Sequence, residues 1–367
     1  MKSLNGITTY LPNGLPPEWI WSEKLLYQLS AAERNLARLE EVGNAFPIPH
    51  IVIRPFVRKE AVQSSLIEGT RTTFEELLTF EAHQMNLPEL FADRQEVQNY
   101  VYALDYGLER MKTLPISLRL IQEIHNMLMN GVRGQSKDPG EFRKEQNWIG
   151  RPGATLETYV PPAADDIPAC LTALEGYIYQ ESDLPSLIRI ALIHYQFEAI
   201  HPFQDGNGRI GRLLIIFLMI HWGLLSQPYL YLSHYLENNR TEYYDRMLAV
   251  SQKGAWEEWI SFFLEGVQIQ ADDAVRRIQS IQQLRMAYKK TFASDRSREN
   301  LAHMLDYFIS TPISTVAQTK EKAKLGSFST IQRYMDKLVE YGILEELTGN
   351  KRNRLYRAKE VMRVLQS

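Results

Sequence analysis

The stretch from Pro185 to Gly223 constrains the fold of this 367-residue chain most, because it places two apolar helical segments on either side of a glycine-rich turn. Apolar residues occupy nearly every face of 187–200, which indicates a helix at the centre of a domain. Pro185 suits the first turn of that helix. A second apolar helix is expected over 209–223. The sequence therefore predicts a mainly α fold built around these two helices.

Helical periodicity recurs along most of the remaining chain. Further helices are predicted at 22–42, 57–66, 75–83, 94–113, 118–129, 165–180 and 256–288. The run 46–50, which contains two prolines, reads as extended. Prolines and glycines also break the pattern over 138–162, where 156–160 reads as a strand or as half of a short hairpin.

The last 70 residues show another pattern, after a polar segment at 295–300 that reads as a linker. A turn at Gly349-Asn350 separates two predicted strands and indicates a hairpin. The predicted order of elements is three helices at 298–310, 316–324 and 329–340, followed by strands at 343–347 and 354–356. This order predicts a winged helix. The segment 298–367 has 12 Lys and Arg against eight Asp and Glu, a net charge of +4.

Composition limits the class of protein. Hydrophobic residues make up 44% and charged residues 23%, which is ordinary for a globular protein, and the net charge of -3 gives no attraction of the whole chain to nucleic acid or membrane. The single cysteine, Cys170, excludes an intramolecular disulfide and suits a reducing compartment. The N-terminus lacks the apolar run of a signal peptide, and the most apolar stretch, 213–225, is too short to span a bilayer. We expect a cytoplasmic protein without a membrane partner.

The turn between the two apolar helices carries the chemistry. Gly206 and Gly208 let the main chain turn sharply and approach a ligand closely. The unpaired N–H groups at the start of the following helix form an anion site. Arg209 and Arg212, three residues apart, lie on one side of its first turn and can hold phosphate oxygens.

Two further side chains complete this site. Asp205 supplies a carboxylate that suits a Mg²⁺ ion shared with the phosphates. His201 precedes the turn and can accept a proton near neutral pH. A base, a metal ligand, an anion site and two cations are the parts that phosphoryl-type transfer requires, because positioning and charge neutralisation dominate that chemistry.

Two other nucleotide-binding classes also use glycine-rich turns. The run 206–211 also fits the GxGxxG pattern of dinucleotide-binding proteins. That pattern requires a preceding strand within a βαβ unit, whereas 187–200 reads as helix. A P-loop is disfavoured because no Walker lysine follows the glycines.

The stretch 201–212 resembles the signature of the Fic family of nucleotidyl transferases, HxFx[D/E]GNGRxxR, and every defined position is matched. The resemblance implies a helical Fic-like core in which His201 deprotonates a target hydroxyl that attacks the α-phosphate of ATP, with Asp205 holding Mg²⁺. It also implies that the nucleotide contacts the helix start and its arginines. These nucleotide-binding positions are Gly206, Asn207, Gly208, Arg209, Ile210, Gly211 and Arg212.

The segment 64–69 has the form [S/T]xxxE[G/N], in which Glu68 ends a predicted helix and Gly69 stops it. It resembles the N-terminal inhibitory motif of Fic proteins, which begins here with Ser64. The resemblance implies that Glu68 pairs with Arg212 and so occupies the cation that should hold the γ-phosphate. The expected division is an N-terminal helical region with the inhibitory helix over 1–95, a Fic catalytic core over 96–290 and the winged-helix domain over 298–367.

Two further segments resemble Fic elements more loosely. The run Thr158, Tyr159 and Val160 resembles the edge of the small β-hairpin flap that positions the target by β-augmentation; a plain surface loop is the alternative. By position, Asn239 and Tyr235 resemble residues on the adenine side of the pocket, and a helix face with satisfied polar groups is the alternative for each.

The sequence therefore predicts a protein adenylyltransferase that uses ATP and Mg²⁺ to modify a Tyr, Thr or Ser hydroxyl of a target protein or of itself. It leaves open transfer of another group such as UMP or phosphocholine, reversible removal of AMP, a homodimer, and a nucleotide-sensing DNA-binding regulator. The winged helix can bind either DNA or protein. Its candidate basic contacts are Arg333, Lys337, Lys351, Arg352, Arg354 and Arg357.

Overall fold

The chain is predominantly helical in its computed structural model, which describes residues 2–4, 7–18, 21–83, 88–132, 138–149, 159–349 and 353–366. This agrees with the predicted mainly α class. The N-terminal and central elements are β1 (Lys2–Leu4), β2 (Ile7–Thr9), α1 (Glu23–Asn44), α2 (His50–Ile67), α3 (Phe74–His83), α4 (Pro88–Arg110), α5 (Leu118–Leu128), α6 (Ile167–Tyr179), α7 (Ser186–Ile200), α8 (Asn207–His221), α9 (Ser233–Asn238), α10 (Arg240–Lys253) and α11 (Trp256–Thr291).

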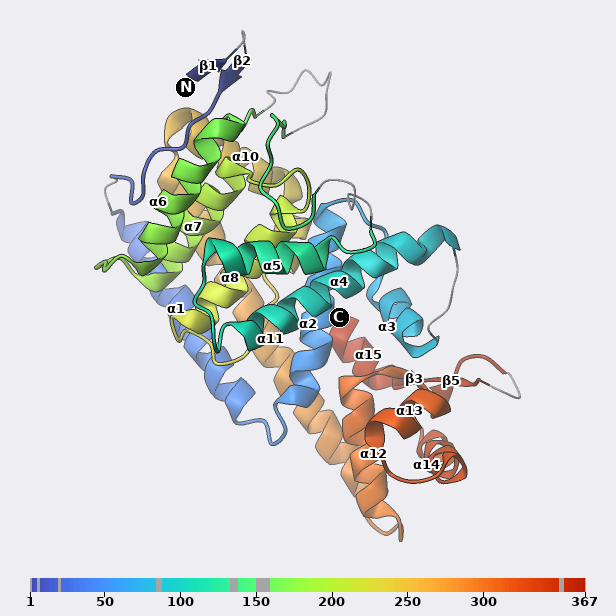
Figure 1. Cartoon of the computed structure of the whole chain (residues 1–367). Coiled ribbons are helices and arrows are strands. Elements are labelled where there is room, and N and C mark those ends of the chain that lie inside the picture. The colour runs from blue at the N-terminus through green and yellow to red at the C-terminus, as the bar shows by residue number, and fades with distance from the viewer. Residues whose placement is uncertain are drawn as a thin grey trace.

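Helices α7 and α8 form the centre of the core, as the sequence predicts (Figure 1). Every residue of α7 from Leu187 to Ile200 is buried, and so are the residues of α8 from Arg209 to Met219. The long helix α11 packs against α1 and α7 and extends from this core to the C-terminal elements (Figure 1). Because α7 and α8 are fixed by neighbours on all sides, the loop that joins them has little freedom.

Helix α2 differs from the prediction. It begins at His50, so the run 46–50 is not a long extended segment and the helix starts seven residues before position 57. Pro49 has helical angles (φ -54°, ψ -38°) and opens the helix, while Pro55 lies inside it. Buried Ile51 and Val52 stabilise the first turns by packing, which outweighs the main-chain hydrogen bond lost at Pro55. The predicted end is correct, because Glu68 caps the helix and Gly69 has a φ of +94°.

Short elements were missed by the sequence analysis. The hairpin of β1 and β2 and the helices α9 and α10 were not predicted as elements. Strands β1 and β2 have three residues each and α9 has six, too few for a full period, whereas α10 has 14 residues but buries only Tyr243 and Val250. Among the described residues no helix is long and apolar enough to cross a membrane.

The C-terminal elements gather at one end of α11 (Figure 1). They are α12 (Arg298–Ser310), β3 (Ile313–Thr315), α13 (Val316–Ala323), α14 (Phe328–Glu340), β4 (Glu345–Glu346), β5 (Leu355–Arg357) and α15 (Lys359–Gln366). The predicted hairpin is present as β4 and β5, and β3 adds a third antiparallel strand in the order β3-β5-β4. Strand β3 was missed because it is only three residues long.

The C-terminal elements are tied to the rest of the chain. The segment predicted as a linker is held in place, since Asp295 accepts hydrogen bonds from Lys337 and Tyr341. Across the boundary, Arg357 pairs with Glu75 of α3 at 2.6 Å. Two of the predicted basic contacts, Lys337 and Arg357, are therefore engaged within the protein, and Lys351 and Arg352 lie outside the described residues.

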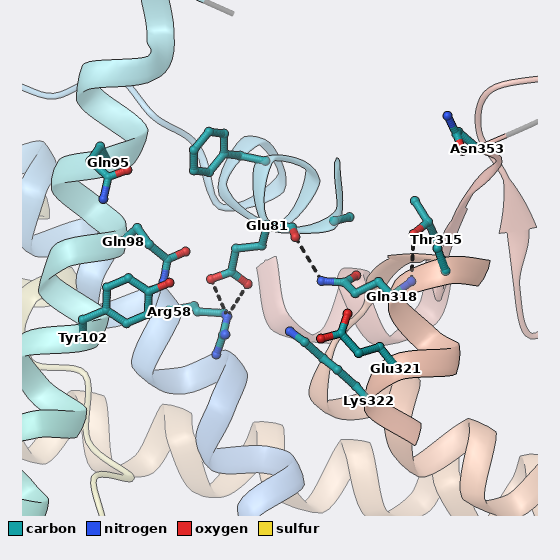
Figure 2. Close-up of a pocket in the computed structure, with 13 residues that line it drawn as sticks. Arg58, Glu81, Gln95, Gln98, Tyr102, Thr315, Gln318, Glu321, Lys322 and Asn353 are labelled. Atoms are coloured by element: carbon teal, nitrogen blue, oxygen red, sulfur yellow. Dashed lines mark hydrogen bonds and ion pairs between the residues drawn. The ribbon is translucent and has the colours of Figure 1, made fainter. Parts of the chain in front are cut away.

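A polar groove of about 850 Å³ is lined by residues of α2, α3, α4, β3 and α13 (Figure 2). The ion pair of Arg58 with Glu81 forms part of its wall, and Gln318 donates a hydrogen bond to the main-chain oxygen of Glu81 across it. None of its lining residues belongs to the turn 201–206 or to α8. The groove is thus separate from the glycine-rich turn.

Candidate active site

The turn between α7 and α8 is set by two residues with positive φ angles. His201 caps α7 at φ 50° and ψ 60°, a conformation that costs a residue other than glycine about 1–2 kcal/mol. Gly206 precedes α8 at φ 77°. A Cβ atom at position 206 would lie 2.9 Å from the sulfur of Met129, so glycine is required there for space as well as for conformation.

His201 has the properties of a general base. Its Nδ1 atom lies 3.3 Å from the carbonyl oxygen of Glu198, which can only accept, so Nδ1 carries the proton and Nε2 is the acceptor. The ring is half-buried and not sealed in the interior. Burial lowers the pKa of His201 to about 4, against a smaller opposing effect of the Glu198 hydrogen bond. The imidazole is therefore neutral at pH 7 and able to take a proton.

The main chain of the turn is held by side chains from other segments. Asn207 accepts a hydrogen bond from the N–H of Phe203 and donates one to its carbonyl oxygen, both at 2.8 Å. Asn147 donates to the same carbonyl oxygen at 3.1 Å. Both polar groups of the Asn207 side chain are thus used on the turn. If Asn207 contacts phosphate as predicted, the contact would come from its main-chain N–H group.

His125 of α5 holds the second half of the turn, and no motif in the sequence pointed to it. Its Nδ1 accepts the N–H of Gly140 at 2.8 Å, so Nε2 carries the proton and donates to the carbonyl oxygen of Asp205 at 3.0 Å. Its ring stacks on Phe203 with centroids 3.7 Å apart. Burial lowers the pKa of His125 to about 4, which keeps this tautomer neutral at pH 7.

The start of α8 has the predicted features of an anion site. The first hydrogen bond within the helix runs from the N–H of Ile210 to the oxygen of Gly206, so the N–H groups of 207–209 precede it. Arg209 is 3% exposed and pairs with Glu96 of α4 at 3.3 Å. Its guanidinium also lies 3.7 Å from the carboxylate of Asp205. Glu96, which the sequence analysis missed, holds Arg209 in place at the base of the site.

Glu68 lies against this helix start and pairs with Arg212. The two side chains meet at 2.6 Å, and Arg212 also donates to the hydroxyl of Ser64 at 2.8 Å and to its carbonyl oxygen at 3.0 Å. Burial alone would raise the pKa of Glu68, but the charge and hydrogen bond of Arg212 outweigh it and hold the pKa below its usual value. A Cβ atom at Gly208 would lie only 2.2 Å from the Glu68 carboxylate.

The Glu68 carboxylate therefore covers the first turn of α8 and neutralises its second arginine. Any anion at the helix start would meet this negative charge at close range.

Family models account for just over half of the chain. The Fic/DOC family N-terminal model matches residues 26–109, and the Fic/DOC family model matches residues 115–219, which include the turn and most of α8.

The chain belongs to the Fic/DOC family.

Curated relatives carry the name "Protein adenylyltransferase Fic". The relative from Drosophila virilis is 30% identical over 205 residues, which are 52% of this chain and 40% of that protein. The relative from Culex quinquefasciatus is 31% identical over 152 residues, 41% of this chain and 27% of that protein. The chain thus spans less than half the length of these relatives.

Solved structures agree on the Fic fold. A Fic family protein from Desulfovibrio desulfuricans G20 superposes with a TM-score of 0.61 at 18% identity, covering 94% of this chain and 98% of that one. Fic-1 from C. elegans superposes with a TM-score of 0.56 at 19% identity, covering 71% of this chain and 74% of that one.

Asp205 is the one residue predicted to hold the metal, and its carboxylate fits Mg²⁺. Its side chain is 36% exposed at the mouth of the turn, and one oxygen accepts the N–H of Gly206 at 2.7 Å. Mg²⁺ usually binds one or two carboxylates together with substrate phosphates and water. Among the described residues no group of three or more His, Cys, Asp or Glu side chains could hold a metal alone. A single carboxylate is consistent with an ion that arrives with the nucleotide.

Part of the predicted Fic flap lies within the described residues, and Thr158 lies outside them. Tyr159 pairs with Ile149 in an antiparallel bridge, and its hydroxyl donates to the carbonyl oxygen of Ala199 near the end of α7 at 3.0 Å. On the opposite edge, the carbonyl oxygen of Val160 accepts the N–H of Tyr10 at 2.9 Å. The base of the flap is thus strand-like and is anchored two residues before His201.

The two residues predicted for the adenine side of the pocket lie next to each other at the end of α9. Asn239 lies between α9 and α10, and its side chain donates to the carbonyl oxygen of Tyr235 at 2.9 Å. Tyr235 is 8% exposed, with its ring packed against Phe262 of α11 at 5.0 Å. The Tyr235 ring is thus largely covered, and nucleotide contact by either residue stays a prediction. Tyr244 of α10 is half-buried, and its pKa is raised to about 12 by burial and by the charge of Glu68.

Glu198 is a buried carboxyl that the sequence analysis read only as part of a core helix. It is 6% exposed, and a Cβ atom at Gly211 would lie 2.1 Å from its Oε1 atom. Burial raises the pKa of Glu198 to about 8, although the charge of Arg212 opposes this, while the charge of Glu68 adds to it. Glu198 is therefore neutral at pH 7 and leaves the charge of Arg212 available to Glu68.

Proposed function

We propose that this chain is a protein adenylyltransferase that moves AMP from ATP to a Tyr, Thr or Ser hydroxyl of a protein. The observation that carries the proposal is the position of a neutral, half-buried His201 six residues before an anion site with two buried arginines. The relatives named protein adenylyltransferase support the same reaction.

In the proposed reaction the target hydroxyl approaches Nε2 of His201, the ring atom left free to accept a proton. The hydroxyl oxygen forms a bond to the α-phosphorus of ATP as the bond to the bridging oxygen breaks. The proton moves to His201, and pyrophosphate leaves. The N–H groups at the start of α8, with Arg209 and Arg212, would neutralise the phosphate charge. Asp205 would hold Mg²⁺, which would supply positive charge against the phosphates.

Autoinhibition by Glu68 is part of the proposal. ATP whose γ-phosphate uses Arg212 must displace Glu68, because both anions need the same guanidinium. Ser64 would remain in contact with Arg212 through its hydroxyl and carbonyl oxygen and keep the guanidinium oriented. Removal of AMP and self-modification stay open within this scheme.

For the C-terminal elements we propose a winged helix that binds protein rather than DNA. The order α12, β3, α13, α14, β4 and β5 supports the class. Internal pairing of Lys337 and Arg357 leaves fewer cations for phosphates, and Phe328 on α14 is 52% exposed. A gel-shift assay checks this: binding to DNA that weakens steeply with salt would contradict the proposal.

Labelled nucleotides test the reaction. The Glu68→Gly variant is incubated with Mg²⁺ and ATP labelled at either the α- or the γ-phosphorus, with and without cell lysate. We expect protein to take up the α label and not the γ label, and the double variant with His201→Ala to take up neither. Transfer of the γ label would indicate a kinase, and equal use of UTP or CDP-choline would indicate another group. Absence of any transfer by Glu68→Gly, with or without lysate, would overturn the proposal.

A further inference from the structure

Arg143, between α5 and α6, is a buried arginine whose hydrogen bonds in the described part of the chain all go to carbonyl oxygens. It is 4% exposed. Its Nε donates to His201 at 2.9 Å, and its own N–H donates to Pro202 at 2.8 Å. Its Nη1 donates to Glu145 at 2.9 Å and its Nη2 to Pro162 at 2.5 Å. One side chain therefore joins the catalytic turn to Glu145 and Pro162, which precede and follow the two residues of the Ile149–Tyr159 bridge at the base of the flap.

The chemistry of these contacts requires arginine. The three carbonyl oxygens lie around one planar guanidinium, whose five N–H groups point in fixed directions. A lysine ammonium reaches fewer acceptors in such a site. Burial lowers the pKa of Arg143 to about 10, so the group remains charged at neutral pH and its hydrogen bonds remain charge-assisted.

The contact with His201 acts on a strained residue. The N–H of His201 donates to Phe197 at 3.0 Å, and its carbonyl oxygen accepts from Arg143, so both main-chain groups are fixed while φ is 50°. Strained residues persist only where their surroundings hold them. The direction of the imidazole depends on this main-chain conformation.

We propose that Arg143 is a positioning residue for the transfer reaction: it fixes the main chain of the catalytic histidine and holds the flap at a set distance from that residue. A hydroxyl presented by a target on the flap then meets Nε2 of His201 in reactive geometry. The inference rests on the proposed function, because it assigns to Arg143 the alignment of target and base and no part in binding the nucleotide.

Kinetics in the Glu68→Gly background test the inference with Arg143→Ala and Arg143→Lys. A misplacement of about 1 Å costs on the order of 10²-fold in rate, so we expect kcat to fall by about that factor while the KM for ATP changes less than about threefold. Guanidinium added to Arg143→Ala should restore part of kcat, since it can occupy the vacated site. Arg143→Lys should fold but remain slow.

Arg189 provides a matched control. It is also buried, and it donates only to carbonyl oxygens, those of Tyr177, Ile178 and Gln180, away from the turn. Arg189→Ala should lower the melting temperature without a selective loss of kcat and without rescue by guanidinium. The inference is overturned if Arg143→Ala and Arg189→Ala lose equal kcat. It is also overturned if guanidinium restores no part of the kcat of Arg143→Ala.

Hydrogen exchange separates this inference from the proposed function. In Arg143→Ala the amides of 199–205 should exchange at least tenfold faster than in the parent, whereas Arg189→Ala should leave them unchanged. Unchanged exchange there would overturn the inference whatever the activity. Lack of transfer by Glu68→Gly alone would instead count against the adenylyltransferase proposal.

Discussion

Replacing Glu68 by glutamine should strengthen ATP binding, because it removes the charge that competes for Arg212 and keeps the side-chain length. A hydrogen bond between charged groups contributes about 1.5–3 kcal/mol. Arg212 is 2% exposed, but the Glu68 side chain is 32% exposed and partly screened, so the lower half of that range applies. About 1.5–2 kcal/mol corresponds to about 10–30-fold tighter binding.

The assay is calorimetric titration with ATP and Mg²⁺ in a His201→Ala background, where no turnover disturbs the equilibrium. Glu75→Gln is the matched control, because Glu75 pairs with Arg357 at the same 2.6 Å but lies at the boundary with the C-terminal elements. It should leave ATP binding unchanged. Equal affinity of Glu68→Gln and the parent would refute the competition, and an equal gain in both variants would show a general charge effect.

Three further predictions concern buried groups around the site. The pKa of Glu198 is near 4.5 in the unfolded chain and about 8 in the folded protein, so between these pH values the carboxyl is charged only when the chain unfolds. The parent should therefore lose stability relative to Glu198→Gln as pH rises from 5 to 8. Urea midpoints that change with pH by the same amount in both proteins would contradict this. Gly211→Ala should cost about 1–3 kcal/mol by overpacking against Glu198, and Glu198→Ala in the same chain should recover part of the loss. His194 of α7, whose Nδ1 lies 3.2 Å from the carbonyl oxygen of Gly211, is a third histidine beside the site. The folded pKa values of His125, His194 and His201, about 4, 3 and 4, lie below the usual 6.5, so the unfolded chain binds more protons and stability should fall as pH drops from 6.5 toward 4. A flat melting temperature over this range would contradict neutral rings in the folded protein.

Long apolar helices such as α7 could be predicted, whereas β3, α9 and the mostly unburied α10 could not. The segment 187–200 spans almost four helical turns and has apolar residues on nearly every face, so the sequence alone predicted that the whole helix is buried. The strand β3 and the helix α9 have three and six residues, too few for a period to appear. At α2, prolines indicated an extended segment, but burial of neighbouring apolar side chains determined the helix.

The predicted site residues fall into two groups. Arg212, Glu68 and Ser64 come together in the predicted pairing. Nucleotide contact by Tyr235 stays a prediction, because position along the chain gives no information about which face of a short helix is buried. The cytoplasmic location and the homodimer stay predictions.

Spacing within one turn of chain determined the centre of this protein: a histidine, three glycines and two arginines within 201–212 require a tight turn that opens a helix. Only the tertiary structure decided which distant groups meet that turn. Glu96 on Arg209, Arg143 on His201 and the neutral Glu198 behind Arg212 depend on the packing of separate helices. Local hydrogen bonding follows from sequence spacing, whereas burial and the pairing of charges depend on which surfaces the whole chain brings together.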